Sequence, residues 1–124
     1  MTTLFTKLQT VAVPVKDQDR TKALLEDLGF TATIDMELQP GFRWVELAFP
    51  SGEGASLSLV TTGVELPTGI DTGIRLLTTD ARAAHAQLAE KGLDVGELLD
   101  WESTPLMFSF LDPDGNRFYV SQDG

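Results

Sequence analysis

Few side chains in this sequence could take part in catalysis, and those that could are suited to proton transfer rather than to thiolate chemistry. The chain has no cysteine, so a nucleophilic thiolate is excluded. Its single histidine, His85, stands among alanines in a segment with helical spacing and is expected to be an ordinary helix-surface residue. Glu46 and Tyr119 are the weak candidates for a general acid or base.

A second group of side chains is suited to recognition. Trp44 and Tyr119 could stack on a planar ligand, and Trp101 could reach the rim of the same pocket. Arg75 and Glu46 carry opposite charges, so each could pair with the other or with a ligand. The alternative reading is that the large apolar side chains fill a core or a dimer interface and that the two charges form a structural ion pair.

Composition limits the class of protein and of partner. A chain of 124 residues, 42% hydrophobic and 23% charged, is expected to form one globular domain. The net charge of −10 repels phosphate backbones, so nucleic acid is not an expected partner. The same charge would serve solubility or attract cationic ligands. Without a signal peptide, a long apolar run or cysteine, the chain is expected to be cytoplasmic and not to associate with a membrane.

A tight turn near the end of the chain has a counterpart in the first half. Asp112-Pro-Asp-Gly115 is flanked by apolar residues, which is typical of a β-hairpin. Phe49-Pro-Ser-Gly52 has the same form and lies 63 residues earlier. This spacing indicates an internal repeat.

Other positions keep the same offset and define the two halves. Paired under it are Asp17 with Asp80, Gly29 with Gly92, Val45 with Phe108, and Leu47 with Phe110. Helix caps, helix stops and turns therefore repeat together, and each half reads as β-α-β-β-β. We predict a single domain over residues 1–124, with module one at about 7–61, a linker at about 62–72 and module two at about 73–122.

The expected elements follow from hydrophobic spacing and from turn residues. Helices are expected over 21–28 and 81–91, preceded by the capping residues Asp17 and Asp80. Pro14 cannot donate to a ladder, so its strand must lie at an edge or carry a bulge there, unless it ends there. Strands are expected over 8–15, 30–38, 43–49, 55–61, 73–78, 106–111 and 117–122, with one more within 93–101.

These features together resemble the vicinal oxygen chelate superfamily. The resemblance rests on the paired modules, on Val15-x-Asp17-x-Asp19 before a helix that ends in Leu28-Gly29-Phe30, and on the closing Asp112-Pro-Asp-Gly-Asn116 hairpin. That group includes glyoxalase I, extradiol dioxygenases, fosfomycin-resistance enzymes and bleomycin-resistance proteins. The resemblance implies an α+β fold in which two βαβββ modules form a cupped, mostly antiparallel sheet. It also implies a ligand site inside the cup and a homodimer.

The resemblance further implies four positions that hold a divalent metal in the family's enzymes. In this sequence they fall on Thr10, Ser58, Gly73 and Tyr119. None of these is a usual ligand for a divalent ion, and glycine has no side chain. We therefore expect no metal site and no cofactor.

Because side chains alternate between the two faces of a strand, the residues on the same face as these four positions are predicted to line the ligand site. Residues on the same face mix aromatic, thioether, hydroxyl and charged groups, as a small-molecule pocket does, while the opposite face is apolar. The predicted ligand-binding residues are Thr10, Trp44, Glu46, Ser58, Arg75, Trp101, Met107, Ser109 and Tyr119.

Three functions remain open from the sequence. The favoured one is a member of the resembled superfamily with a degenerate metal site that binds a small aromatic or cationic molecule, as in the sequestration of an antibiotic or a metabolite. The second is a metal-independent lyase, isomerase or oxygenase-like enzyme with Glu46 or Tyr119 as acid or base. The least favoured is a metal-dependent glyoxalase or dioxygenase.

Overall fold

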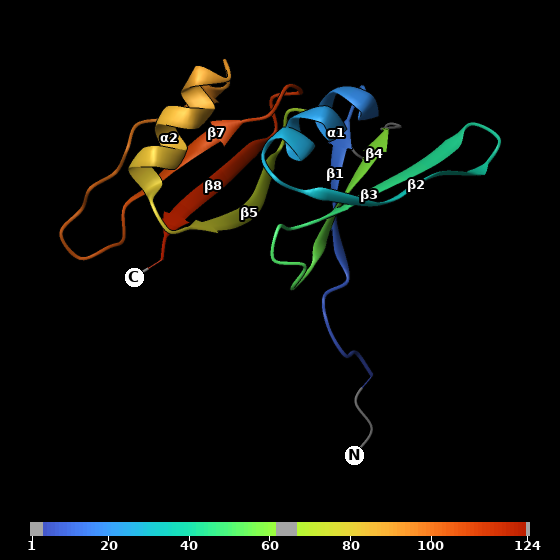
Figure 1. Ribbon diagram of the computed structural model, residues 1–124, viewed down its shortest axis with the longest axis horizontal. Coiled ribbons are helices and arrows are strands. Elements are labelled where there is room, and N and C mark those ends of the chain that lie inside the picture. Colours follow the sequence, from blue (N-terminus) through green and yellow to red (C-terminus); the bar gives the residue numbers. More distant parts are fainter. Residues whose placement is uncertain (1–3, 62–66, 124) are drawn as a thin grey trace. The chain divides into compact units, whose positions relative to one another are not determined.

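The chain divides into two compact units, Met1–Leu66 and Pro67–Gly124. The structure is a computed structural model that describes residues 4–61 and 67–123 (Figure 1). Each unit contains one four-stranded mixed sheet and one helix. In the described residues no helix has the length and apolar character needed to cross a membrane.

The first unit contains β1 (Thr10–Val15), α1 (Gln18–Asp27), β2 (Thr31–Gln39), β3 (Phe42–Ala48) and β4 (Ser56–Thr61). Its strands are ordered β1-β4-β3-β2. The β1–β4 pair is parallel, and the other two pairs are antiparallel. Strand β1 is therefore at the edge of the sheet, as its internal proline requires.

The second unit contains β5 (Asp71–Thr78), α2 (Ala81–Glu90), β6 (Asp94–Val95), β7 (Met107–Leu111) and β8 (Arg117–Gln122). Its strand order, β5-β8-β7-β6, repeats that of the first unit. Again the first and last strands pair in parallel, and the others pair antiparallel. The predicted α+β fold of two βαβββ modules is confirmed.

The capping signals that marked the repeat act as the sequence predicted. The side chains of Asp17 and Asp80 accept hydrogen bonds from the backbone N–H three residues further on, at 3.2 and 3.0 Å. Gly29 and Gly92 follow the helices with φ of 102° and 84°, a conformation that favours glycine. Both helices therefore begin and end for the same local reasons.

Each helix packs on the apolar face of its own sheet. Helix α1 contacts β2, β3 and β4, and α2 contacts β6, β7 and β8. The alternate residues of the strands that form these faces are almost fully buried, which leaves the other face of each sheet for the polar side chains. The buried set comprises Val13, Val45, Leu47, Leu57 and Leu59 in the first unit and Phe108, Phe110, Phe118 and Val120 in the second.

Several predicted elements differ in their bounds from those observed. Helix α1 begins at Gln18, three residues before the expected start, and β1 begins at Thr10, two residues after its expected start. Strand β5 begins at Asp71, two residues before the expected start, because the chain pairs with β8 on both sides of a bulge around Gly73. The strand expected within 93–101 is reduced to Asp94–Val95 and an isolated bridge between Leu99 and Met107. Residues 62–66 of the predicted linker lie outside the described residues.

The two hairpin turns that revealed the repeat are held by different contacts. In the first, the ring of Phe49 packs against Phe30 with centroids 4.7 Å apart. In the second, the buried carboxylate of Asp112 accepts hydrogen bonds at 2.9 Å from the backbone N–H and the side-chain amide of Asn116. The amide oxygen of Asn116 in turn accepts the N–H groups of Gly69 and Ile70. This turn therefore fixes the segment that enters the second sheet.

Candidate functional site

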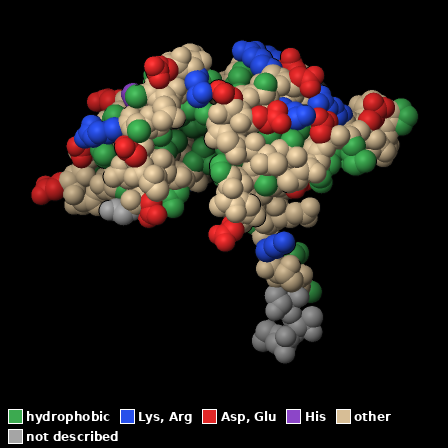
Figure 2. All heavy atoms as spheres, in the orientation of Figure 1, with side chains coloured by type: hydrophobic (Ala, Val, Ile, Leu, Met, Phe, Trp, Pro, Cys, Tyr) green, Lys and Arg blue, Asp and Glu red, His purple; other side chains and the backbone are tan. Residues whose placement is uncertain are grey.

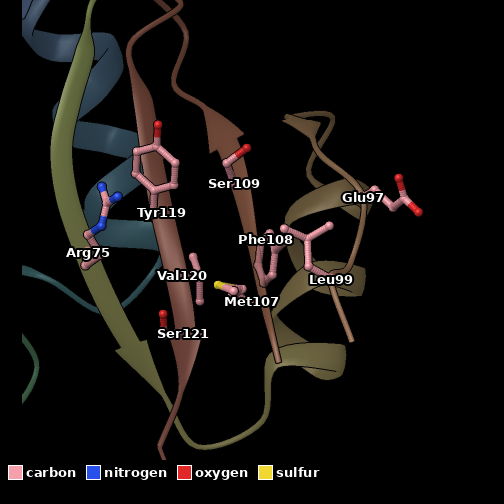
Figure 3. A pocket seen from close by; sticks show the side chains of 9 residues that line it. All are labelled: Arg75, Glu97, Leu99, Met107, Phe108, Ser109, Tyr119, Val120 and Ser121. Carbon is pink, nitrogen blue, oxygen red and sulfur yellow. The ribbon is translucent and has the colours of Figure 1, made fainter. Parts of the chain in front are cut away.

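The second sheet places its polar side chains on the face opposite α2. His85 of α2 contacts the ring of Phe108, so α2 covers the face to which Phe108 points. Tyr119 and Ser109 face each other across β8 and β7, and Arg75 on β5 is paired with Tyr119 from the other side. Side chains of these three adjacent strands therefore converge on one surface (Figure 3).

A cavity of about 240 Å³ lies on this surface. Four of the residues predicted to bind a ligand line it, together with five that the sequence did not single out for binding. Leu99 and Met107 give it an apolar wall, and its polar groups come from Arg75, Glu97, Ser109, Tyr119 and Ser121. Phe108 and Val120, which lie opposite each other on β7 and β8 with their side chains in the core, also border it. An apolar wall with a few polar groups is the usual composition of a small-molecule pocket.

Tyr119 is held in place by a carboxylate that the sequence prediction assigned to the linker. Its hydroxyl donates to Asp71 Oδ2 at 2.5 Å, and the N–H of Gly73 donates to Asp71 Oδ1 at 3.0 Å. Gly73 has φ of 72°, and this bulge turns the Asp71 carboxylate toward the phenol. Asp71 was missed because the strand was expected to begin at Gly73, so residue 71 was assigned to the linker.

This hydrogen bond shifts the pKa values of both partners. The pKa of Asp71 is lowered, chiefly because the Tyr119 hydroxyl and then the Gly73 N–H stabilise the charged carboxylate. The pKa of Tyr119 is raised, chiefly because its proton is engaged by Asp71. The phenol therefore stays protonated at neutral pH and is a hydrogen-bond donor rather than a base.

Two arginines lie near Tyr119. The Arg75 guanidinium carbon lies 3.9 Å from the centre of the Tyr119 ring, within the range of a cation–π contact, and Arg75 Nη1 donates to the Gly73 carbonyl at 3.2 Å. Arg117 Nη1 donates to the Ser109 hydroxyl at 2.8 Å. Neither guanidinium is among the four ion pairs formed by the described residues.

The predicted site residues of the first unit form a separate hydrogen-bonded cluster. Glu46 is buried and accepts hydrogen bonds from the Trp44 indole at 3.0 Å and from the Ser56 hydroxyl at 2.7 Å. The hydroxyls of Thr10 and Ser58 lie 2.5 Å apart and hydrogen-bond to each other. Glu46 thus pairs with neutral donors of its own sheet.

Trp101 and His85 lie elsewhere in the second unit. The side chain of Trp101 is exposed and does not line the cavity. His85 is half-buried rather than a surface residue: its Nε2 is 2.8 Å from the Gly96 carbonyl, and its ring packs edge-on against Phe108. The prediction for His85 was wrong because the short β6 strand lets residues 96–99 lie beside the helix. Its contacts there are structural.

The four positions at which related enzymes would hold a metal do not offer a suitable donor set. Two are hydroxyls bound to each other, one is a glycine, and one is a phenol bound to Asp71. Divalent ions in proteins are held by imidazole, carboxylate or thiolate groups. Across residues 4–61 and 67–123, no group of three or more His, Cys, Asp or Glu side chains is arranged to hold an ion.

Comparison with known proteins gave a match to one family. The model of the Glyoxalase/Bleomycin resistance protein/Dioxygenase superfamily matches residues 7–120. A search of the curated proteins gave no match.

Several solved structures share the fold over nearly the whole chain. A member of the same superfamily from Sphaerobacter thermophilus DSM 20745 is 27% identical, with a TM-score of 0.84 and coverage of 98% of this chain and 100% of its own. TnmS3, an antibiotic binding protein from Streptomyces sp. CB03234, is 29% identical, with a TM-score of 0.83 and coverage of 99% and 100%. A glyoxalase/bleomycin resistance protein from the same Streptomyces strain is 32% identical, with a TM-score of 0.76 and coverage of 94% and 100%.

Proposed function

This chain belongs to the Glyoxalase/Bleomycin resistance protein/Dioxygenase superfamily, and we propose that it binds a small planar molecule without converting it. The observation that carries the proposal is the cavity of the second unit, in which Tyr119 and Arg75 stand beside an apolar wall. Sequestration of an antibiotic or of a metabolite is the role that such binding would serve. The likeness to TnmS3, described as an antibiotic binding protein, supports this direction.

The proposed binding residues in the second unit are Arg75, Met107, Ser109 and Tyr119. Met107 supplies a flexible apolar surface, which adapts to irregular ligands. The ring of Tyr119 is fixed by Asp71, so little conformational entropy would be lost when a ligand packs on it. Ser109 and Ser121 add hydroxyls that could orient a polar group of the ligand.

The polar cluster of the first unit is also proposed to contact a ligand. Trp44 provides the large flat side chain, and its indole N–H is already held by Glu46. Thr10 and Ser58 provide hydroxyls on neighbouring strands. Trp101 is kept as a candidate at the rim because an exposed tryptophan is a frequent contact for aromatic ligands.

Catalysis by the predicted acid or base groups is less favoured. Both carboxylate oxygens of Glu46 accept hydrogen bonds from neighbouring side chains, which leaves this group poorly placed to remove a proton from a substrate. The raised pKa of Tyr119 suits a donor and not a base. The hydroxyl, glycine and phenol positions do not fit a divalent metal, so no step through a metal is derived.

A thermal-shift screen tests the proposal. Planar aromatic compounds, whether cationic, neutral or anionic, are added to the protein with chelator present, and each compound that binds is recovered and checked by mass spectrometry. Ligand at about 100 times its Kd should stabilise the fold by roughly 2.7 kcal/mol, and the compound should be recovered unchanged. Absence of stabilisation by every compound, or recovery of a modified compound, would count against binding without turnover.

We also propose that two chains associate as a homodimer. Hydrophobic side chains gather over the outer end of the β2–β3 hairpin (Figure 2), where Met36, Leu38 and Phe42 are 55%, 51% and 44% exposed. Strand β2 is an edge strand, so a partner could cover this surface. Light scattering should give twice the mass of one chain, and Leu38→Lys should yield monomers while Leu8→Ser, at another exposed leucine, should not.

A further inference from the structure

The charged side chains around the cavity of the second unit point to the charge of the ligand. Among the described residues that line the cavity, Arg75 and Glu97 carry charge. Figure 3 shows the Arg75 side chain beside Tyr119, whereas the Glu97 carboxylate points away from the other lining side chains. The charge next to the aromatic ring is therefore positive, although the whole chain carries −10.

Neither arginine near the ring is neutralised by an ion pair. Carboxylates outnumber lysines and arginines by 19 to 9, yet none lies in ion-pair contact with Arg75 or Arg117 in the described part of the chain. Asp71 is close enough to interact electrostatically with both arginines, but its carboxylate accepts its hydrogen bonds from the Tyr119 hydroxyl and the Gly73 N–H. The two guanidinium groups and the Asp71 carboxylate together carry a net charge of +1, when Glu97 is left out because its carboxylate points away from the ring.

Both guanidinium groups are also held in place by the sheet. Arg75 is fixed by the ring beneath it and by the Gly73 carbonyl, and Arg117 is fixed by the Ser109 hydroxyl. A guanidinium has five N–H donors, and these contacts use one from each arginine. The remaining donors are suited to an oxygen anion, which forms stronger hydrogen bonds with guanidinium than a neutral acceptor does.

We propose that the cavity selects an organic anion: an aromatic ligand whose carboxylate or phenolate oxygen binds at Arg75. The ring of such a ligand would lie against Met107 and Leu99, and its charged oxygen would lie toward the guanidinium. This inference rests on the proposed binding function and names the ligand class for the same site. It also replaces the cationic ligand that net charge alone would favour, because the local charge at the binding surface differs in sign from the total.

Three probes of equal shape separate the possibilities: 2-naphthoate, 2-naphthalenemethanol and 2-naphthylmethylammonium. Calorimetric titration at about 50 mM salt should show naphthoate binding at least about tenfold more tightly than the ammonium compound. This preference should fall as salt is raised, because the arginine is exposed to screening. Arg75→Lys should keep part of the preference, since the charge remains but the planar donor group is lost.

The decisive variant is Arg75→Gln, and Arg82→Gln is its matched control. Both lower the net charge equally, but Arg82 lies on α2 and pairs with Asp100. The first should bring the affinities for naphthoate and the ammonium compound within about threefold, while the second should leave the preference intact. Tighter binding of the ammonium compound, or equal effects of the two variants, would overturn the organic-anion assignment and leave the binding function standing. Absence of saturable binding by all three probes would count against both.

Discussion

The phenol of Tyr119 stands between a carboxylate and a guanidinium, and the two neighbours act on different parts of it. Asp71 holds its hydroxyl and Arg75 covers its ring. The hydroxyl is therefore committed to the protein, while the two arginines keep donors available for a ligand. At the scale of single residues, this division of roles makes recognition a better reading of the site than proton transfer.

Replacement of Tyr119 by phenylalanine tests that division. The ring and its contact with Arg75 remain, but Asp71 loses the donor that lowers its pKa most, so its pKa should rise toward the ordinary value of about 3.9. A carboxyl whose pKa is lower in the folded protein than in the unfolded chain stabilises the fold at pH values above the unfolded-state pKa. This stabilisation is lost as the pH falls through the folded-state pKa. When the pH is lowered from about 5 to 2, the free energy of unfolding of the variant should therefore fall by less than that of the wild type.

Carboxyl-carbon NMR titration of Asp71 is the direct measurement of this shift. Asp100, whose pairing with Arg82 the substitution does not touch, serves as the internal control. An unchanged Asp71 titration in the variant would show that the phenol does not donate to this carboxylate in solution.

Individual site residues could be predicted where a strand is regular. Arg75, Met107, Ser109 and Tyr119 follow from alternation along β5, β7 and β8, and the structure brings them to one cavity. Asp71 was not predicted because the strand was expected to begin at Gly73, although alternation along a longer strand would place residue 71 on the same face as residues 73 and 75. The Gly73 that forms the bulge was visible in the sequence, but a glycine alone does not fix its position in a ladder.

At the scale of elements, the two hairpins that revealed the repeat have different stabilising contacts. The first is closed by two aromatic rings, whereas the second is closed by Asp112 and Asn116 and tied to residues 69 and 70. Burial raises the pKa of the Asp112 carboxyl despite the hydrogen bonds that it accepts. The second hairpin thus contains polar groups that depend on one another for partners.

Loss of the Asn116 amide should be costly. Asn116→Ala leaves the Asp112 carboxylate and the N–H groups of Gly69 and Ile70 without these partners, and Asn116 is fully buried. Unsatisfied buried groups cost about 1–3 kcal/mol each, so we expect the free energy of unfolding to fall by about 2–4 kcal/mol. Urea unfolding followed by circular dichroism measures it.

Ser51→Ala in the corresponding turn of the first unit is the control. The Ser51 hydroxyl accepts one exposed hydrogen bond from the Glu53 N–H, so its loss should cost less than about 0.5 kcal/mol. Equal costs for the two variants would show that the Asn116 contacts add no stability. The sequence predicted both turns from their proline and glycine, but not the contact from Asn116 to a segment 46 residues away.

At the scale of the whole molecule, the internal repeat determined how much of the fold was predictable. Caps, stops and turns at one offset fixed the order of elements in both units, and the family match over residues 7–120 agrees. The ligand was not predictable from the same features, because repeated signals describe the backbone. Its chemistry depends on side chains that differ between the halves, such as Glu46 in one and Ser109 in the other.

Chelation tests the metal-free character of the proposed site. Protein purified without chelator should contain no stoichiometric iron, manganese, nickel or zinc by elemental analysis, because the donor positions are hydroxyls, a glycine and a bound phenol. Dialysis against EDTA should leave probe affinity unchanged within about twofold. A stoichiometric metal whose removal abolishes binding would refute the proposed mode.

The most direct test of binding in the second unit is an NMR titration with 2-naphthoate. In ¹H–¹⁵N spectra the account predicts saturable shifts concentrated at Met107, Ser109, Tyr119 and their neighbours, with the probe unchanged after recovery. Shifts confined to other surfaces, or consumption of the probe, would contradict it.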